Sequence, residues 1–343
     1  MKKLMMALPL AATLAACGGN GAGSSATQLK AVGSSTVYPF TTAVAEAYQR
    51  ANPGSSVIVE STGTGAGIKL FCSGIGSEFP DMVNASRPMK ASEYADCAKA
   101  GAPQVIELPI GIDGLTLIQA AGAQPLDLTV RDIYAALAAK PFGKEQTAQT
   151  WQDVNPALPP IKIRVLGPPP TSGTRDSLAE LILEKGCQAD PAMKALKESN
   201  EDEYKTICTR VREDGAFVEA GENDNLLVQK VSADPAALGV LGYSFLEENK
   251  QKVRPVAIAG VLPTEATIGD LSYPGARKLF VYVKGEHLAV KPGIRDFVAA
   301  FARAWAPDGL LEKRGLVPLA GADAAAANEQ AVKLAPLDPA TLK

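Results

Sequence analysis

The chain is poor in histidine. Its 343 residues include one, His287, and its cysteines lack the paired short spacings of zinc sites. Because zinc is held mainly by cysteine and histidine, we expect neither a metal nor a cofactor. A serine hydrolase with Ser172 or Ser35 as nucleophile would need a base, most often an imidazole, and we interpret the segment 284–287 as a surface turn. The composition therefore argues against an enzyme, and the hydrolase is only an alternative.

The chain also lacks an excess of positive charge. It has 34 lysine and arginine residues against 37 aspartate and glutamate residues, which gives a formal net charge of −3. Proteins that bind nucleic acids usually carry a broad basic surface. We therefore expect no nucleic-acid partner, and any bound anion must be held by a local site.

Long apolar runs are missing after the first residues. Lys2 and Lys3 precede the apolar run Leu4–Leu14, which is followed by Ala-Ala-Cys17. A basic start, a short apolar core and a small-residue cleavage site are typical of a secretory signal, and the core is too short to span a bilayer. The segment from Leu14 to Cys17 resembles a bacterial lipobox, so we expect Cys17 to be the lipidated mature N-terminus. The alternative is an ordinary secreted protein with a spare thiol.

The segment after Cys17 has the composition of a spacer. Residues 18–25 read GGNGAGSS and show no apolar periodicity, which is typical of a flexible linker. We thus predict a signal peptide over 1–16, and a lipidated N-terminus with its tether over 17–27. The protein would lie in the periplasm, held to the inner or the outer membrane, or exposed at the cell surface, by its lipid anchor only.

Four cysteines remain in the part of the chain expected to fold. In an oxidising compartment an even number of cysteines suggests disulfides, and four residues allow three pairings. We favour the two pairs that close local loops. They are Cys72 with Cys97 and Cys187 with Cys208.

One local pattern occurs three times: a short β-rich run, a loop of small polar residues and a segment with helical spacing of apolar residues. This alternation is typical of α/β lobes built on largely parallel sheets. The runs are 29–32, 57–59 and 161–165, and the loops are 33–36, 61–67 and 167–174.

These loops have the composition of anion sites. The first amide groups of a helix have no partner within the helix and carry partial positive charge, and small residues let an anion approach them. Two arginines lie in suitable positions, Arg87 in NASRP and Arg175 directly after Ser-Gly-Thr, and a guanidinium matches phosphate oxygens. Each loop alone is better explained by ordinary helix capping, so the prediction of an anion site rests on all three together.

Motifs along the whole folded part resemble those of one family. They are GSSTVYPF (33–40), STGTGAGIKLF (61–71), PDMVNASRPM (80–89), IGIDGLTLI (110–118), TSGTRDS (171–177), ENDNLLVQK (222–230), ALGVLGYSF (237–245) and GLVPL (315–319). In order and spacing the chain resembles the substrate-binding proteins of phosphate ABC importers, which belong to the type II periplasmic binding proteins.

The resemblance implies an α/β protein of two lobes, joined by two crossing strands around a central cleft. The first lobe would comprise 28–112 and 258–343, and the second lobe 113–257. A monomer would bind inorganic phosphate or a related oxyanion in the cleft and deliver it to an ABC permease. The residues expected to contact the anion by this resemblance are Ser35, Thr36, Val37 through its amide, Thr64, Ser172, Gly173 and Thr174.

The chain departs from the family at two positions. Many members have an aspartate where this chain has Arg87, and an arginine where it has Pro168. We expect Arg175 to replace the missing arginine, and Asp113 or Asp224 to supply the missing acceptor, although both aspartates also fit ordinary turns. An alternative function follows: a surface lipoprotein of the same fold that binds another phosphate-bearing ligand or acts in phosphate-starvation signalling.

Overall fold

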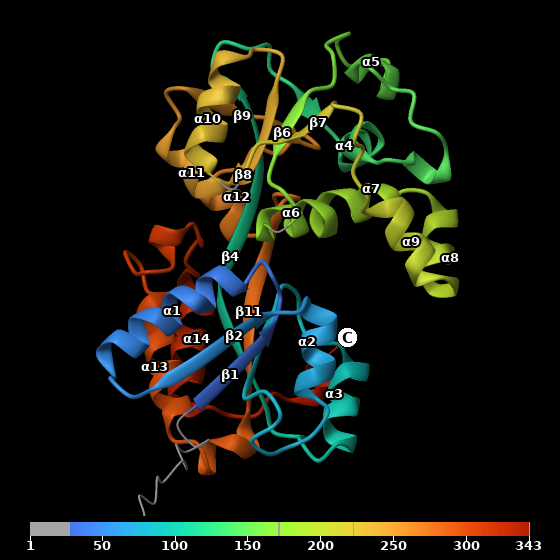
Figure 1. Cartoon of the computed structure of the whole chain (residues 1–343). Helices are drawn as coiled ribbons and strands as arrows, with labels where there is room; N and C mark the ends of the chain where they lie inside the picture. The colour runs from blue at the N-terminus through green and yellow to red at the C-terminus, as the bar shows by residue number, and fades with distance from the viewer. Residues whose placement is uncertain (1–27, 171, 222, 343) are drawn as a thin grey trace, which may run out of the picture.

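The computed structural model describes residues 28–170, 172–221 and 223–342. The predicted signal peptide, Cys17 and the tether lie outside the described residues. The chain forms two lobes, one above the other in Figure 1, which are connected by the long strands β4 (Val105–Ala120) and β11 (Ala276–Lys284). The expected α/β architecture is confirmed.

The lower lobe is built on a mixed sheet. β1 (Gln28–Gly33) lies between β2 (Ser56–Ser61) and β3 (Met82–Ala85), and all three are parallel. Parallel strands of one sheet need crossover connections, which α1 supplies from β1 to β2 and α2 supplies from β2 to β3 on the other side of β1. β11 then pairs antiparallel with β3 on one side and with β4 on the other.

β4 belongs to both lobes. Its residues 105–114 pair with β11, and its residues 115–119 pair with β8 (Leu238–Gly242) of the upper lobe. β9 (Val253–Pro255) also pairs with the upper end of β4. The upper sheet continues through β6 (Val165–Gly167) to β7 (Phe217–Glu219), both parallel. The changeover between Gly114 and Leu115 thus places a continuous strand at the junction of the lobes.

Near residue 258, where the resemblance implies a return to the first lobe, the chain forms a short strand pair. β10 (Ala257–Ile258) pairs with β5 (Asp127–Leu128), which holds this segment on the upper lobe. α12 (Glu265–Gly269) follows, and β11 then leads downwards.

Helices cover both sheets. Their apolar faces follow helical spacing, as in α1, where Phe40, Val44, Ala45 and Tyr48 are buried. Of the helices within the described residues, none is both long and apolar enough to cross a membrane. Those of the lower lobe are α1 (Tyr38–Ala51), α2 (Thr64–Phe71), α3 (Ala91–Lys99), α13 (Gly293–Ala304), α14 (Gly321–Lys333) and the 3₁₀ turns η3 (Gly285–Ala289), η4 (Glu312–Arg314) and η5 (Pro339–Thr341).

The upper lobe has more and shorter helices. A single helical stretch runs through α6 (Gly173–Ser177), the π-helical segment η2 (Leu178–Leu183) and α7 (Glu184–Cys187). The others are α4 (Val130–Leu137), the 3₁₀ turn η1 (Pro141–Gly143), α5 (Trp151–Val154), α8 (Pro191–Ser199), α9 (Glu201–Cys208), α10 (Asp224–Ala233) and α11 (Tyr243–Glu248).

Two disulfides brace the lobes, and the favoured pairing is confirmed. Cys72–Cys97 joins the end of α2 to α3, and Cys187–Cys208 joins α7 to α9. The four cysteines are buried within apolar clusters. The lobes therefore have covalently fixed helical margins, while β4 and β11 connect them.

Candidate functional site

Three strands end near the junction of the two lobes. β1, β2 and β6 each lead through a short polar loop into α1, α2 and α6, as the sequence predicted. Two of these loops touch: a Cβ atom added at Gly173 would lie 2.7 Å from the Cα atom of Thr36. An approach this close leaves no room for a side chain, so the lobes are in backbone contact at this point.

Arg277 lies at the centre of this interface. It belongs to β11, its side chain is 9% exposed, and one terminal nitrogen donates to Thr36 Oγ1 at 2.9 Å and to Ser177 Oγ at 2.8 Å. Thr36 comes from the lower lobe and Ser177 from the upper lobe. Because a guanidinium is a planar fork of donors that suits oxyanions, Arg277 places a permanent charge where hydroxyl groups of both lobes meet.

Carboxylates of both lobes hold Arg277 in place. Asp113, on β4, accepts from the Arg277 Nε at 3.3 Å and from Ser177 Oγ at 2.7 Å. Glu180, in the π-helical segment, accepts from the other terminal nitrogen of Arg277. The predicted ligand Asp113 therefore lies in the cleft, where it orients both the cation and a hydroxyl group.

The second polar loop joins the same network through Ser86. Thr64 Oγ1 lies 2.9 Å from Ser86 Oγ and accepts from the Ser86 amide at 3.1 Å. Ser86 Oγ donates in turn to Glu180 at 3.0 Å. Ser35, in the first loop, donates to Asp176 at the start of the upper helical stretch. The hydroxyls of the two lower loops are thus connected to the upper lobe by hydrogen bonds.

The third loop lines an open part of the cleft. Ser172 caps α6 by accepting from the Thr174 amide at 3.2 Å, as ordinary capping would require. Ser172, Gly173 and Thr174 also line a pocket of about 460 Å³ together with Ser35, Thr36 and Asp113. The Val37 amide donates to Ser34 Oγ at 3.3 Å, so in this arrangement it serves the start of α1.

The structure does not bring Arg87 into this network. Its guanidinium forms two hydrogen bonds to Glu93, at 2.9 and 2.7 Å, and one to the Pro88 carbonyl oxygen at 3.0 Å. The hydrogen bond to Glu93 raises the pKa of Arg87. The contacts of Arg87 therefore fasten α3 to the preceding loop, and its role as a ligand remains a prediction that they do not support.

Arg175 also lies outside the network. Its guanidinium carbon lies 4.5 Å from the centre of the Phe217 ring, and it donates to the Pro168 carbonyl oxygen at 3.0 Å. Arg175 lines a different pocket, beside β7. Burial lowers the pKa of this guanidinium. These contacts hold the guanidinium of Arg175 against Phe217 and the Pro168 carbonyl oxygen, and not against Thr36.

Sequence reasoning missed the residues that connect the loops. Arg277, Ser86 and Ser177 supply donors, and Asp176 and Glu180 supply acceptors, all described above. The available signal for Arg277 was a charged residue inside the largely apolar strand 276–284. An arginine in such a run needs a partner to be buried, which marks it as a candidate for an ionic site.

The expectation that His287 lies in a surface turn is wrong. His287 is 2% exposed, and its Nδ1 lies 2.7 Å from Asp81 Oδ1, while its Nε2 accepts from the Gly76 amide at 3.1 Å. The physical reason is that η3 packs the imidazole against the loop before β3. His287 therefore makes these contacts within the lower lobe, and they do not involve Ser35 or Ser172.

Asp224 lies on the cleft wall at the start of α10. Its half-buried carboxyl lines the same pocket as Ser172 and Gly173. Burial raises its pKa to about 6. A carboxyl group with this pKa can accept or donate a proton near neutral pH, so the position suggested for Asp224 by the sequence is chemically suitable.

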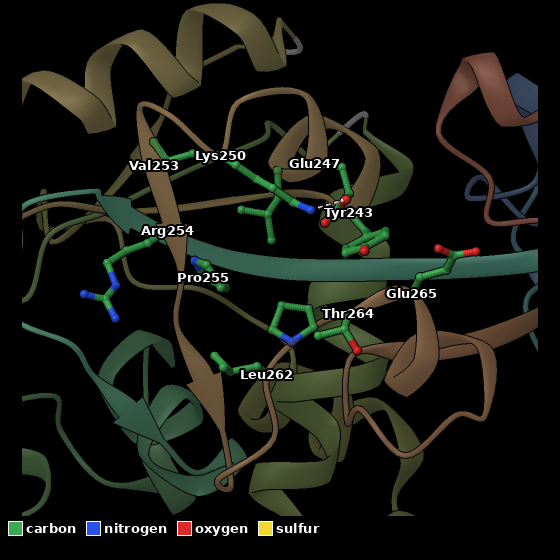
Figure 2. A pocket seen from close by; sticks show the side chains of 11 residues that line it. Tyr243, Glu247, Lys250, Val253, Arg254, Pro255, Leu262, Thr264 and Glu265 are labelled. Atoms are coloured by element: carbon green, nitrogen blue, oxygen red, sulfur yellow. Dashed lines mark ion pairs between the residues drawn. The ribbon is translucent and has the colours of Figure 1, made fainter.

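A pocket of about 400 Å³ lies elsewhere on the upper lobe (Figure 2). Its wall includes Tyr243, Leu262 and Thr264, and an ion pair of 2.5 Å joins Lys250 to Glu247 at its edge. This pocket is lined by α11 and the turn after it, by β9, and by the loop before α12 with the first residue of that helix. Because it does not join the two lobes, we place the candidate site in the cleft. Among the described residues, no group of three or more metal-ligating side chains is arranged to hold an ion.

The chain is similar to known proteins in sequence and in structure. The chain is 36% identical over 275 residues to protein SphX of Synechococcus elongatus, covering 78% of this chain and 70% of SphX. It is 31% identical over 294 residues to the phosphate-binding protein PstS of Staphylococcus saprophyticus, covering 83% and 80%. A solved structure of a possible phosphate-binding protein from Planctomyces limnophilus is 26% identical, with a TM-score of 0.71 and coverage of 89% and 98%.

The fold extends to more distant structures. An ABC-type phosphate transport receptor from Vibrio cholerae is 19% identical with a TM-score of 0.58, over 84% of this chain and 99% of that one. The PBP superfamily domain matches residues 20–304. The resemblance inferred from the motifs is thereby confirmed, and the chain belongs to the PBP superfamily, in the family of the PstS and SphX proteins.

Proposed function

We propose that this protein is an extracytoplasmic receptor that captures inorganic phosphate in the interlobe cleft and presents it to an ABC importer. One observation carries the proposal: Arg277 and the hydroxyls of Thr36 and Ser177 meet where the two lobes join. Three relatives or solved structures described above carry phosphate in their names, which supports phosphate as the anion.

The chemistry is that of a clamp. Donors on the lower lobe come from Ser35, Thr36 and Thr64, and donors on the upper lobe come from the loop 172–174. Charge-assisted hydrogen bonds contribute about 1.5–3 kcal/mol each, so a few of them hold a dianion without a broad basic surface. An anion that contacts both loops favours the arrangement in which the lobes are close, and a permease can recognise that arrangement.

The place of action follows from the N-terminus. Cleavage before Cys17 and lipidation of this cysteine would anchor the protein to a membrane, with residues 18–27 as the tether. At a root-mean-square length of about 5–6 Å × √n, ten flexible residues span on the order of 17 Å. The folded lobes would then work as a monomer in the periplasm, close to a permease in the same membrane.

Calorimetric titration of the purified protein with phosphate, sulfate and glycerol 3-phosphate tests the ligand. We expect tight binding of phosphate and binding of the other two that is at least about tenfold weaker. Thr36→Val and Ser172→Ala, one hydroxyl removed from each lobe, should each weaken phosphate binding by roughly tenfold. The matched control is Ser199→Ala, on the exposed end of α8.

Binding of glycerol 3-phosphate without binding of phosphate would replace the proposal by the alternative receptor for a phosphate-bearing molecule. Equal affinities of Thr36→Val, Ser172→Ala and the control for phosphate would remove the cleft as the site. Mass spectrometry of the membrane-bound protein should find acyl chains on Cys17, and Cys17→Ser should release the protein from the membrane. A membrane-bound Cys17→Ser variant would contradict the anchor.

A further inference from the structure

Two carboxylates of the upper lobe occupy donors that the proposed anion site would use. One oxygen of Glu180 accepts from Ser86 Oγ at 3.0 Å and from a terminal nitrogen of Arg277. A carboxylate of Asp176 accepts from Ser35 Oγ. A hydroxyl and a guanidinium that converge on one oxygen are the donors that bind an oxyanion. Here the oxygen belongs to the protein itself.

Both carboxylates reach across the junction of the lobes. Asp176 and Glu180 are four residues apart in one helical stretch, α6 followed by η2, so they lie on one side of it. Their donors lie in loops of the lower lobe and on the connecting strand β11. The carboxylate contacts therefore exist only while the two lobes are close together.

While these contacts persist, the negative charges of the two carboxylates oppose the entry of an anionic ligand. Arg277 is the cation bonded to Asp113 and Glu180, and Asp176 lies close enough to Glu180 for their charges to interact. Burial, and to a smaller extent the charge of Glu180, raises the pKa of Asp176. Like charges in a half-buried site repel strongly, so an entering dianion and these two carboxylates compete for the same donors.

We infer that Asp176 and Glu180 are an internal competitor of the ligand: they bridge the lobes across the cleft and are displaced when an oxyanion binds. The pair thereby sets the affinity of the site, because each anion must replace existing charge-assisted hydrogen bonds. The identity of the anion rests on the proposed function, whereas the bridge between the lobes does not.

Glu180→Gln and the double variant Asp176→Asn with Glu180→Gln test the competition. These side chains keep nearly the same shape but lose the negative charge. We expect phosphate to bind about tenfold more tightly to Glu180→Gln, and more tightly still to the double variant, in calorimetric titration. Glu213→Gln is the matched control, because Glu213 is an acid of the upper lobe with a side chain that is 79% exposed. It should change the affinity less than about twofold.

A second measurement needs no ligand. Small-angle X-ray scattering of the phosphate-free proteins should give a larger radius of gyration for both variants than for the wild type and for Glu213→Gln. Unchanged or weaker phosphate binding by the variants would overturn the inference, since the carboxylates would then assist the ligand or not touch its site. An unchanged radius of gyration would also overturn it. A wild type that does not bind phosphate refutes the proposed function, and the scattering still decides the inference.

Discussion

Strand β11 carries a buried cation at each end, and the two ends have different roles. Arg277 lies at the junction of the lobes, bonded to residues of both. Lys284 lies at the other end, is 0% exposed, and donates to the Gly74 carbonyl oxygen at 2.5 Å. Close to Lys284 in the chain, His287 and Lys291 bind the buried carboxylate of Asp81. We refer to Asp81, Lys284, His287 and Lys291 as the basal cluster.

All partners of the basal cluster come from one lobe. Asp81 accepts from Lys291 Nζ at 3.0 Å and from the Lys30 amide at 2.8 Å, in addition to its contact with His287. Burial by itself would raise the pKa of Asp81, but the hydrogen bonds from His287, Lys291 and Lys30 outweigh it and the pKa is lowered. These contacts tie η3 and the segment before α13 to the loop before β3 and to β1, all within one lobe, so a movement of the lobes leaves them intact.

We refer to Arg277 and its partners Thr36, Asp113, Ser177 and Glu180 as the cleft cluster. It differs from the basal cluster in one respect that matters for function. Its members come from two bodies joined by β4 and β11, so its hydrogen bonds depend on the distance between the lobes. Burial of charge alone would have marked the basal cluster as the stronger candidate site, since Asp81 is fully buried. A buried ionic cluster suggests binding when its partners can separate, and stability when they cannot.

The largest effect is expected at Asp81. Asp81→Ala should lower the free energy of unfolding by about 3–5 kcal/mol, because the basal cations lose their counter-charge in a buried place. Chemical denaturation monitored by circular dichroism measures this loss, and the phosphate affinity of the folded protein should stay within about twofold. A variant of wild-type stability would show that the basal cluster is not a stabilising element.

The pH dependence of the same contribution has a definite sign. Because the pKa of Asp81 is lower in the folded protein than in the unfolded chain, its contribution is complete above the unfolded value, about 3.9, and is lost as the pH falls through the folded value. The stability difference between wild type and Asp81→Asn should therefore shrink as the pH falls below about 4.

The next largest effect is expected at Arg277, on binding instead of stability. Arg277→Met should weaken phosphate binding by about 30- to 100-fold, since a charge-assisted donor is lost from a desolvated site. Arg277→Lys keeps the charge without the planar fork, so its phosphate affinity should lie between those of the wild type and Arg277→Met. Titration calorimetry measures both. If Arg277→Met binds phosphate as the wild type does, the cleft cluster is no more functional than the basal one.

A smaller effect concerns Lys284. Burial lowers its pKa from 10.5 to about 8, so the folded protein binds fewer protons than the unfolded chain between these values. Stability should therefore rise with pH in this window, by about 1 kcal/mol per pH unit. Lys284→Met removes the titrating group, and the slope of its unfolding free energy between pH 8 and pH 10 should be correspondingly flatter. Equal slopes for the wild type and Lys284→Met would contradict the lowered pKa of Lys284.

The smallest effect is expected at Arg175, which the sequence had placed among the ligands. Its contacts with Phe217 and Pro168 predict that Arg175→Ala changes phosphate affinity by less than about threefold. The loss of packing on the ring should cost on the order of 1 kcal/mol of stability. A loss of tenfold or more in affinity would return Arg175 to the site and reduce the contrast between cleft arginines and peripheral ones.

The sequence predicted those parts of the molecule that depend on local chemistry. Loops of small residues between strand and helix were recognised, and Thr36 and Ser172 line the same cleft. The two disulfides followed from the proximity of cysteines along the chain. Each of these predictions uses residues that are neighbours in the sequence, where propensity and spacing carry the information.

The parts that could not be predicted depend on contacts between distant segments. Arg277 meets Thr36 across 241 positions of the chain and Glu180 across 97, and no local pattern reports such pairs. Arg87 seemed placed for an anion by its loop, yet Glu93 six residues later binds it. His287 follows a glycine and a charged residue that suggest a turn, but the buried Asp81 provides the partner that draws it inside.

The contact between Gly173 and Thr36 has a consequence for the range of guests. Because Gly173 has only a hydrogen atom in place of a side chain, the backbones of the two lobes can approach each other closely at this point. A methyl group added at residue 173 would keep the two loops apart, and solvent would then reach a ligand bound between the lobes. Exclusion of water from the bound ligand therefore depends on the absence of a side chain at Gly173.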